Sequence, residues 1–128
     1  MLAMSAKPTV SRILVIDDED GFRSLLSWQL RLRGWEVHLA ADGEQALRRL
    51  EEQPFHVVIT DLTMPHMEGL AVLQEVERLY PKTKVIVLTG FSTVETAVFT
   101  MKQGAFDFLL KPFVLKELLK TIETALSS

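Results

Sequence analysis

Continuous apolar runs alternate with amphipathic segments along the chain. Three runs, at residues 13–16, 56–60 and 85–88, are rich in Val, Ile and Leu, which is typical of parallel strands covered on both faces. Residues 35–39 instead alternate apolar and polar positions, as expected for an edge strand with one wetter face. A further strand is predicted at 106–110. The pattern therefore predicts five strands, most of them buried on both faces.

Between and after these strands, apolar residues recur at helical spacing and predict five helices. The first runs from about residue 20 to 33, and the second ends before Pro54. The third follows Gly69 and is closed by Tyr80, the fourth stops at Gly104, and a fifth comes after the last strand. The predicted inward stripes are Phe22, Leu25, Leu26 and Leu30; Ala46, Leu47 and Leu50; Leu70, Leu73, Val76 and Leu79; Val94, Ala97, Val98 and Met101; and Leu115, Leu118, Leu119, Ile122 and Leu126.

A few conspicuous residues fit none of these stripes. Trp28 and Leu32 lie off the apolar stripe of the first helix, and we interpret them as partly exposed packing residues, with a partner surface as the alternative. His38 is interpreted as solvated on the wetter face of the edge strand, and His66 as a surface residue.

Strand and helix alternate five times, which favours right-handed crossovers onto one parallel sheet with helices on both faces. We therefore expect a three-layer, doubly wound α/β domain over residues 12–128, preceded by a flexible tail at 1–11. With 128 residues, of which 48% are apolar, the chain has room for one good core and not for a second domain.

Charge and composition narrow the classes of partner. The net charge is −3, from 14 basic and 17 acidic residues, so this domain alone presents no field that attracts nucleic acid or an anionic membrane. The absence of cysteine excludes disulfides and thiolate sites and suits a reducing compartment. No segment resembles a signal peptide or a membrane span, so we expect a cytoplasmic protein.

Polar side chains follow four of the predicted strands at their carboxyl ends: Asp17 and Asp18, Asp61, Thr89, and Lys111. Each has an ordinary explanation by itself, as a helix cap, a turn residue or a solvated cation. Because the carboxyl ends of parallel strands share one edge of the sheet, where sites of open α/β folds lie, the five residues are expected to converge. Their coincidence at one edge indicates a functional site.

An acidic cluster of this kind favours a bound cation. Carboxylates a few ångström apart repel by about a few kcal/mol per pair at an effective dielectric of about 20. Oxygen ligands select a hard ion, and Mg²⁺ fits better than Ca²⁺ because few protein ligands leave room for water and phosphate oxygens; Mn²⁺ can substitute. A carboxylate beside such an ion, with Lys111 and Thr89 nearby, is equipped to attack phosphorus and form an acyl phosphate.

Several groups of residues together resemble the receiver domain of bacterial two-component response regulators. They are Asp17-Asp18, Asp61 with Leu62-Thr63-Met64-Pro65 and then Met67 and Gly69, Thr89-Gly90, and Gly104-Ala105-Phe106-Asp107-Phe108 followed by Lys111-Pro112-Phe113. The resemblance spans about residues 12–126 and implies a flavodoxin-like sheet with strand order 2-1-3-4-5. The segment 92–104 is similar to receivers of nitrogen-regulation-type activators.

The resemblance also implies roles for the converging residues. Asp61 would accept a phosphoryl group from a sensor histidine kinase, and Lys111, joined to Pro112 by a cis peptide, would pair with the acceptor or the phosphoryl group. The ligands of Mg²⁺ would be Asp17, Asp18, Asp61 and the backbone carbonyl of Thr63. Such a domain is not an enzyme with a separate substrate, although it assists its own phosphorylation and dephosphorylation.

Thr89 and Phe108 would form the switch pair implied by the resemblance. They would alter the surface of the fourth helix, fifth strand and fifth helix, where a homodimer or an effector domain binds. Phe108 lacks the hydroxyl of the Tyr that is frequent there, so its signal must travel by packing. Thr63 and the bulky Phe91 flank the acceptor without being obvious positioners of an attacking water, so we predict slow self-dephosphorylation.

Two other classes of protein remain as alternatives. Haloacid-dehalogenase phosphatases also form an aspartyl phosphate, but their Asp-x-Asp motif would require an acid where Thr63 stands. A flavin-binding module of the same fold would place its phosphate near residues 17–20, whose four acidic side chains repel it. The chain is either a stand-alone receiver or part of a longer regulator, for which control of transcription is the expected output.

Overall fold

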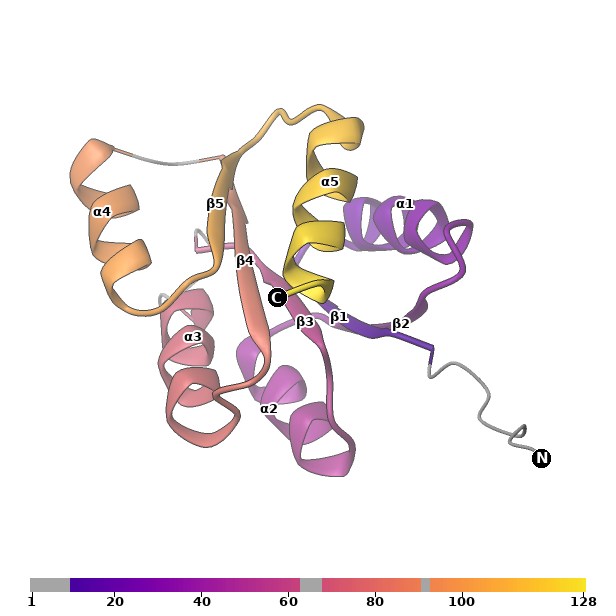
Figure 1. The fold of residues 1–128 in the computed structure, drawn as a ribbon, viewed down its shortest axis with the longest axis horizontal. Helices are drawn as coiled ribbons and strands as arrows, with labels where there is room; N and C mark the ends of the chain where they lie inside the picture. Colours follow the sequence, from indigo (N-terminus) through magenta and orange to yellow (C-terminus); the bar gives the residue numbers. More distant parts are fainter. Residues whose placement is uncertain (1–9, 63–67, 91–92) are drawn as a thin grey trace.

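In a computed structural model, the described part of the chain comprises residues 10–62, 68–90 and 93–128. Strands and helices alternate along it (Figure 1). The elements are β1 (Arg12–Ile16), α1 (Asp20–Arg31), β2 (Glu36–Ala40), α2 (Gly43–Glu52), β3 (Val57–Thr60), α3 (Glu68–Leu79), β4 (Lys84–Thr89), α4 (Val94–Lys102), β5 (Asp107–Leu110) and α5 (Leu115–Leu126). None of the helices described there has the length and apolarity that crossing a membrane requires.

The strands form one parallel sheet in the order β2-β1-β3-β4-β5, which confirms the expected fold class and strand order. Ile16 at the end of β1 pairs with Thr60 at the end of β3, and Thr60 in turn pairs with Val87 of β4. On the far side of β4, Thr89 pairs with Leu110 of β5. The strands that carry the predicted site residues therefore end at nearly the same level of one sheet edge.

Alternate residues of the central strands build two separate cores, one on each face of the sheet. Leu14 and Val58 belong to a cluster with buried residues of α2 and α3, whereas Ile13 and Val57 belong to a second cluster with buried residues of α1 and α5. Figure 1 shows these two pairs of helices on opposite sides of the sheet. Since each fully buried Leu, Ile or Val contributes roughly 1.5–3 kcal/mol, both faces hold the strand ends in place.

Helices α1 and α3 each expose one residue that their predicted stripe places inward. Leu25 of α1 is 60% exposed, and Leu79 of α3 is 47% exposed. The arc of α1 that faces the sheet is occupied by Leu26 and Leu30, and α3 buries Val72, which the predicted stripe omits. Successive helical residues are about 100° apart, so a neighbour of a fully buried residue falls at the margin of the covered arc or beyond it.

The predicted inward stripe of α4 is wrong. Val94, Val98 and Met101 are all exposed, whereas Thr100 is buried and its hydroxyl donates to the carbonyl of Thr96 at 2.8 Å. The helix packs against β5, the edge strand, so the sheet covers only a narrow strip of it. An apolar side of α4 consequently faces solvent.

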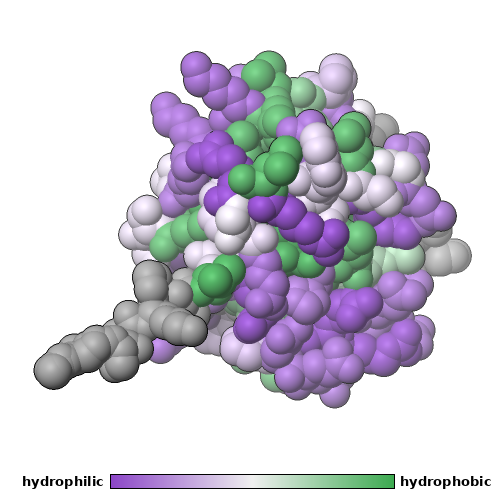
Figure 2. Space-filling view, turned by 90° about the vertical axis from the view of Figure 1, so that its right-hand side faces the viewer, coloured by the Kyte–Doolittle hydropathy of each residue, from purple (hydrophilic) through white to green (hydrophobic). Residues whose placement is uncertain are grey.

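Helix α1 also has an apolar outer side. Trp28 is 61% exposed and Leu32 is 66% exposed, so the interpretation of these two as packing residues is wrong. With Leu25 they follow the helical spacing i, i+3, i+7, and we call these three residues the outer stripe of α1. Figure 2 turns the side of the molecule that carries α1 toward the viewer, and apolar residues interrupt its polar surface. A partner surface, the alternative reading of Trp28 and Leu32, is thereby favoured.

The prediction that His38 is solvated is also wrong. Its ring is half-buried, lies edge-on to Phe55 at 5.4 Å between centroids, and places Nε2 2.7 Å from Oε2 of Glu36. Arg12 donates from Nε to the same oxygen at 2.5 Å. Together the hydrogen bonds of Arg12 and His38 lower the pKa of Glu36 to about 2. His38 therefore belongs to a structural cluster around the start of β1.

Candidate functional site

The ends of β1 and β3 bring two aspartates to the same edge of the sheet. Asp17 and Asp61 each follow directly after a residue of the register pair Ile16 and Thr60. Both aspartates are nearly inaccessible, with 3% and 6% of their surface exposed. Buried carboxylates are rare unless they are paired, because taking a charge out of water is costly. Their burial therefore demands a partner.

Lys111 is that partner, and it comes from the far edge of the sheet. Its Nζ donates to Oδ2 of Asp17 at 2.8 Å and to Oδ2 of Asp61 at 2.9 Å. The backbone N–H of Lys111 donates to the carbonyl of Thr89 at 2.8 Å, which continues the β4–β5 pairing to the rim. The peptide between Lys111 and Pro112 is cis, as predicted. Three of the predicted site residues are thus in direct contact.

The electrostatics of this triad leave an excess of negative charge. Burial by itself lowers the pKa of Lys111, but the hydrogen bonds that its ammonium donates to Asp17 and Asp61 outweigh burial and raise the pKa above its usual value. The ammonium therefore stays protonated at neutral pH. The single positive charge of Lys111 faces two carboxylates, which leaves the triad with a net negative charge. This net charge favours the binding of a cation.

Asp18 is not assembled with the other two aspartates in the same way, since its side chain lies exposed on the rim. Within residues 10–62, 68–90 and 93–128, no three His, Cys, Asp or Glu side chains are close enough to form a ready cluster for a metal ion. One oxygen of Asp17 is occupied locally, because Oδ1 accepts from the backbone N–H of Glu19 at 2.9 Å. The donor set around Asp17 and Asp61 nevertheless consists of oxygen atoms, the ligands that hard cations prefer.

Arg23 is a neighbour of the site that the sequence analysis missed. Its Nη1 donates to the carbonyl of Asp17 at 2.5 Å, and its Nη2 forms an ion pair with Asp20. The guanidinium thereby ties the loop after β1 to the first turn of α1. The spacing of Asp20 and Arg23, i and i+3 on a helix, is the sequence signal from which the ion pair could have been inferred.

Thr89 and Phe108 lie on adjacent strands, at neighbouring positions of the same sheet face. Thr89 is completely buried at the end of β4. Phe108 pairs with Val87, two residues before Thr89, and packs half-buried against the cluster that contains Val87. Paired residues in a sheet project to the same face, so Phe108 and Thr89 share that face. The geometry allows movement of one to be felt by the other through packing.

Gly69 lies unusually close to Asp61 at the end of β3. A Cβ atom placed at Gly69 would lie 2.0 Å from the carbonyl oxygen of Asp61, so only glycine permits this approach of α3. Thr63 and Phe91, predicted to flank the acceptor, and His66 lie outside the described residues. The roles assigned to Thr63 and Phe91 therefore stay predictions.

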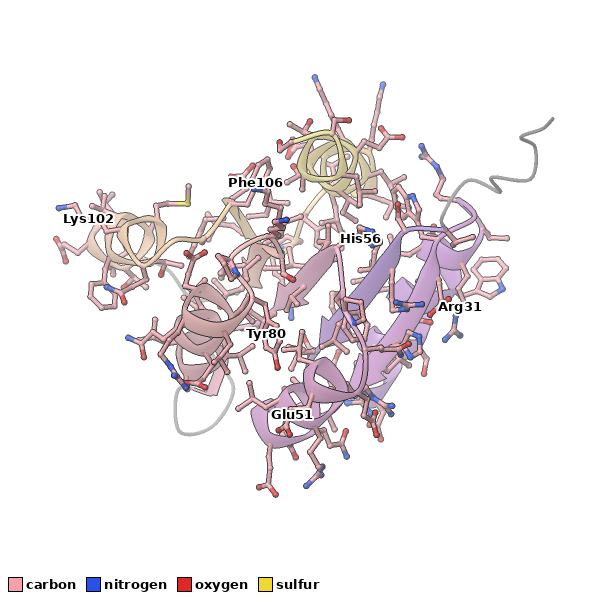
Figure 3. The ribbon with its side chains drawn as sticks, turned by 60° about the horizontal axis from the view of Figure 1, so that its bottom comes forward. Arg31, Glu51, His56, Tyr80, Lys102 and Phe106 are labelled. Atoms are coloured by element: carbon pink, nitrogen blue, oxygen red, sulfur yellow. The ribbon has the colours of Figure 1, made fainter. Side chains whose placement is uncertain are left out.

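A hollow of about 550 Å³ lies at the opposite end of the sheet from the aspartates. Figure 3 brings that end forward, with His56 and Tyr80, two of its lining residues, labelled. Its polar groups serve the fold: the backbone N–H of Arg12 donates to Nδ1 of His56 at 2.9 Å, and Thr83 donates to the carbonyl of Phe55 at 2.7 Å. The buried, charged triad at the carboxyl edge is therefore the candidate functional site.

Comparison with known proteins decides the family. A family model described as the response regulator receiver domain matches residues 13–123. The chain belongs to the receiver-domain family. This receiver is 41% identical to the regulatory protein AtoC of Escherichia coli K12 over 117 residues, which are 91% of this chain and 25% of AtoC.

Two solved structures of response regulators resemble it closely. NtrX from Brucella abortus superposes with a TM-score of 0.85 at 33% identity, over 93% of this chain and 27% of NtrX. A response regulator from Burkholderia pseudomallei, solved with a phosphorylated aspartic acid, a calcium ion and citrate, superposes with a TM-score of 0.83 at 32% identity. That match covers 91% of this receiver and 69% of the Burkholderia chain.

These relationships confirm three of the sequence-based expectations. The chain is a receiver of two-component response regulators, its fold is that of the family, and its resemblance to nitrogen-regulation-type activators is borne out by AtoC and NtrX. The family match favours the receiver domain over the phosphatase and the flavin-binding module. The receiver spans only about a quarter of the length of AtoC and NtrX.

Proposed function

We propose that this receiver accepts a phosphoryl group on Asp61, from the phosphohistidine of a sensor kinase or from a small phosphodonor such as acetyl phosphate. The observation that carries the proposal is the buried carboxylate of Asp61 with the Lys111 ammonium 2.9 Å from its Oδ2. An isolated carboxylate would repel an anionic phosphate, whereas one with a counter-charge in contact can be approached. Asp61 is the nucleophile, and Lys111 neutralises charge.

In the transfer, a carboxylate oxygen of Asp61 forms a bond to phosphorus while the bond from phosphorus to the donor's imidazole nitrogen or acetate oxygen breaks. The leaving group keeps the electron pair of the broken bond, and the product is an acyl phosphate. Lys111 remains beside the transferred oxygens because it is also held by Asp17. Hydrolysis later restores Asp61, so the protein acts on itself and turns over no separate substrate.

The proposed cofactor is Mg²⁺, held by Asp17, Asp18, Asp61 and the backbone carbonyl of Thr63. The buried pair of carboxylates exceeds the charge of Lys111, which fits a divalent cation, and the exposed Asp18 lies next to Asp17 on the rim. When bound, the ion would stabilise charge on the phosphoryl oxygens as a Lewis acid; Mn²⁺ can take its place. The Burkholderia relative was solved with a calcium ion, which is consistent with a hard cation in a protein of this kind.

The proposed output runs from Thr89 to the surface formed by α4, β5 and α5. Phosphorylation would draw the Thr89 hydroxyl toward a phosphoryl oxygen, and Phe108 would fill the space vacated, which shifts a pre-existing equilibrium between two packings. The exposed residues Phe99, Leu110 and Val114 give that surface an apolar character suited to a second copy or an effector domain. In a longer regulator, the effector would control transcription.

The outer stripe of α1 is the proposed contact for the sensor kinase. A phosphohistidine must reach Asp61 from the carboxyl edge of the sheet, and α1 begins at that edge, three residues after Asp17. The outer stripe runs from Leu25 toward Leu32 at the end of α1, and its exposed apolar side chains are available for burial. Its net charge of −3 gives the domain by itself no overall attraction for nucleic acid, so we propose no nucleic-acid partner for it.

Mass spectrometry after treatment with acetyl phosphate and Mg²⁺ tests the acceptor. Wild type should gain one phosphate, and Asp61→Asn should gain none. Asp107→Asn is the matched control, since Asp107 begins β5 at the opposite end of the sheet and should label like wild type. Chelation of the metal should abolish the labelling of wild type and of Asp107→Asn. Comparable labelling of Asp61→Asn would contradict the assignment.

A further inference from the structure

The ammonium of Lys111 has a third contact besides the two aspartates. Its Nζ lies 4.2 Å from the centroid of the Phe22 ring, well within the distance of a cation–π interaction. Phe22 lies in the first turn of α1 and is not part of the motifs that point to the receiver family. Its ring therefore gives the ammonium a further contact besides the two carboxylates.

The Phe22 ring is itself held in orientation. Phe113, two residues after Lys111, meets it edge-on, with centroids 6.1 Å apart and planes at 86°. Edge-to-face contacts of this kind favour one ring orientation over a freely turning one. The chain that carries Lys111 thus also supplies the residue that presents the face of Phe22 to it.

The ammonium of Lys111 needs a contact that the proposed chemistry does not occupy. The side chain is long, and its partners Asp17 and Asp61 are the groups that the proposed chemistry also uses for the metal ion and the phosphoryl group. When a carboxylate is engaged elsewhere, its hold on the ammonium weakens. The ring face of Phe22 takes part in neither task, so its attraction for the ammonium persists through the reaction.

We propose that Phe22 is a positioning residue for phosphoryl transfer, because its ring face keeps the Lys111 ammonium at the acceptor. The inference rests on the proposed function of Asp61. Phe22 acts through Lys111 and is not itself a catalytic residue. Its aromatic face, rather than its volume, is the property that the reaction requires.

A purely structural role for Phe22 is the competing account. Phe22 packs, half-buried, against the core that α1 and α5 share, and with Leu25, Leu26 and Phe113 it lines a notch of about 170 Å³. If filling this space were its whole role, Leu or Met would serve nearly as well as Phe or Tyr. The two accounts therefore differ in whether an aromatic ring is needed.

The experiment compares Phe22→Leu, Phe22→Met and Phe22→Tyr in the full chain, with the rate of labelling by acetyl phosphate and Mg²⁺ as the readout. Phe106→Leu is the matched control: it removes the same ring from the same hydrophobic core, but Phe106 precedes β5 at the opposite end of the sheet (Figure 3). We expect Phe22→Leu and Phe22→Met to label about three- to tenfold more slowly. Phe22→Tyr and Phe106→Leu should stay within about twofold of wild type, as expected when the ring face is kept or the site is untouched.

A second readout needs no phosphorylation. Protons above a ring face are shielded, so the ε-methylene protons of Lys111 in wild type should resonate upfield of those of the exposed Lys116 and Lys120. The shift should persist in Phe22→Tyr and disappear in Phe22→Leu or Phe22→Met, whichever folds. If wild-type Lys111 shows no upfield shift, the proposal is overturned even where the other variants are not obtained.

The two proposals fail separately. Absence of labelling in wild type would refute the phosphoacceptor function, while the chemical shifts would still decide whether Phe22 seats Lys111. If wild type labels, then Phe22→Leu reacting as fast as wild type, or Phe22→Tyr reacting as slowly as Phe22→Leu, would overturn the positioning role.

Discussion

Nζ of Lys111 lies 2.9 Å from Oδ2 of Asp61, although 50 positions separate the two residues in the sequence. The contact spans β4, since Asp61 follows β3 and Lys111 follows β5. It exists because the parallel strands end nearly level and because both side chains turn toward Asp17. The reactivity proposed for Asp61 depends on this ammonium.

Replacing Lys111 with Met should slow labelling by acetyl phosphate about a hundredfold, the usual effect of losing one group that stabilises transition-state charge. The methionine keeps most of the side-chain volume but removes the ammonium from two buried carboxylates, so circular dichroism must first show that the variant folds. Lys116→Met, an exposed position in the first turn of α5, is the control and should label normally. Stopped-flow or gel-shift measurement of the labelling rate distinguishes Lys111→Met from Lys116→Met. A Lys111→Met variant within twofold of wild type would show that Asp61 works without its neighbour.

Gly69→Ala should destabilise the domain by about 1–3 kcal/mol, the usual range for overpacking. The added methyl group would meet the carbonyl oxygen of Asp61, and α3 or Asp61 would have to move. Gly21→Ala is the matched control because a Cβ there meets nothing within 4 Å. In helix α1 it should raise stability by about 0.5–1 kcal/mol. Urea unfolding of both variants gives the comparison; equal stabilities would contradict the close approach.

Ser27→Ala should stabilise the domain by about 1 kcal/mol. Ser27 is 1% exposed, and in the described part of the chain its hydroxyl is the buried side-chain oxygen that has no hydrogen-bond partner. Ser24→Ala, on the exposed side of the same helix, should add only the helix-propensity gain of about 0.5 kcal/mol. Thermal unfolding of the two variants isolates the difference. A smaller gain for Ser27→Ala than for Ser24→Ala would mean that the buried hydroxyl is well satisfied.

The stability of the domain should fall as the pH drops below the ordinary pKa of the Glu36 carboxyl. Its pKa falls from 4.5 to about 2 in the folded protein, so the unfolded chain takes up the proton first as the pH drops. Its contribution is complete above pH 4.5 and is lost toward about pH 2. Carbon-detected NMR titration should place the midpoint of the Glu36 carboxyl near the lower value. Glu36→Gln should flatten this part of the stability profile, whereas the exposed Glu51→Gln should not.

The phosphoryl group on Asp61 should be lost slowly, and we expect Phe91 to influence the rate. A phenyl ring offers no hydrogen bond to a water in line with the phosphorus, so self-dephosphorylation should be slow. Phe91→Glu and Phe91→Lys should each change the half-life of the phosphorylated protein by about severalfold or more, measured by loss of label after removal of the donor. Identical half-lives in wild type and both variants would show that the side chain does not control the water.

The sequence by itself determined the elements and their order. Apolar runs and helical spacings are local properties, so β1, β3 and β4 are readable as buried strands and the helices as their crossovers. Because parallel strands share their carboxyl edge, the convergence of Asp17, Asp61 and Lys111 follows from where each stands in its strand.

The tertiary structure alone decided how each helix turns about its own axis. That rotation depends on which neighbours compete for the covered arc, and these neighbours are distant in sequence. Leu25 therefore faces solvent although it belongs to an apolar stripe, and α4 shows its apolar side because an edge strand covers only a strip of it. The same rotation of α1 sets the ring of Phe22 against Lys111, 4.2 Å from the ammonium. No spacing in the chain encodes that contact, because it joins the first turn of one helix to the end of the farthest strand.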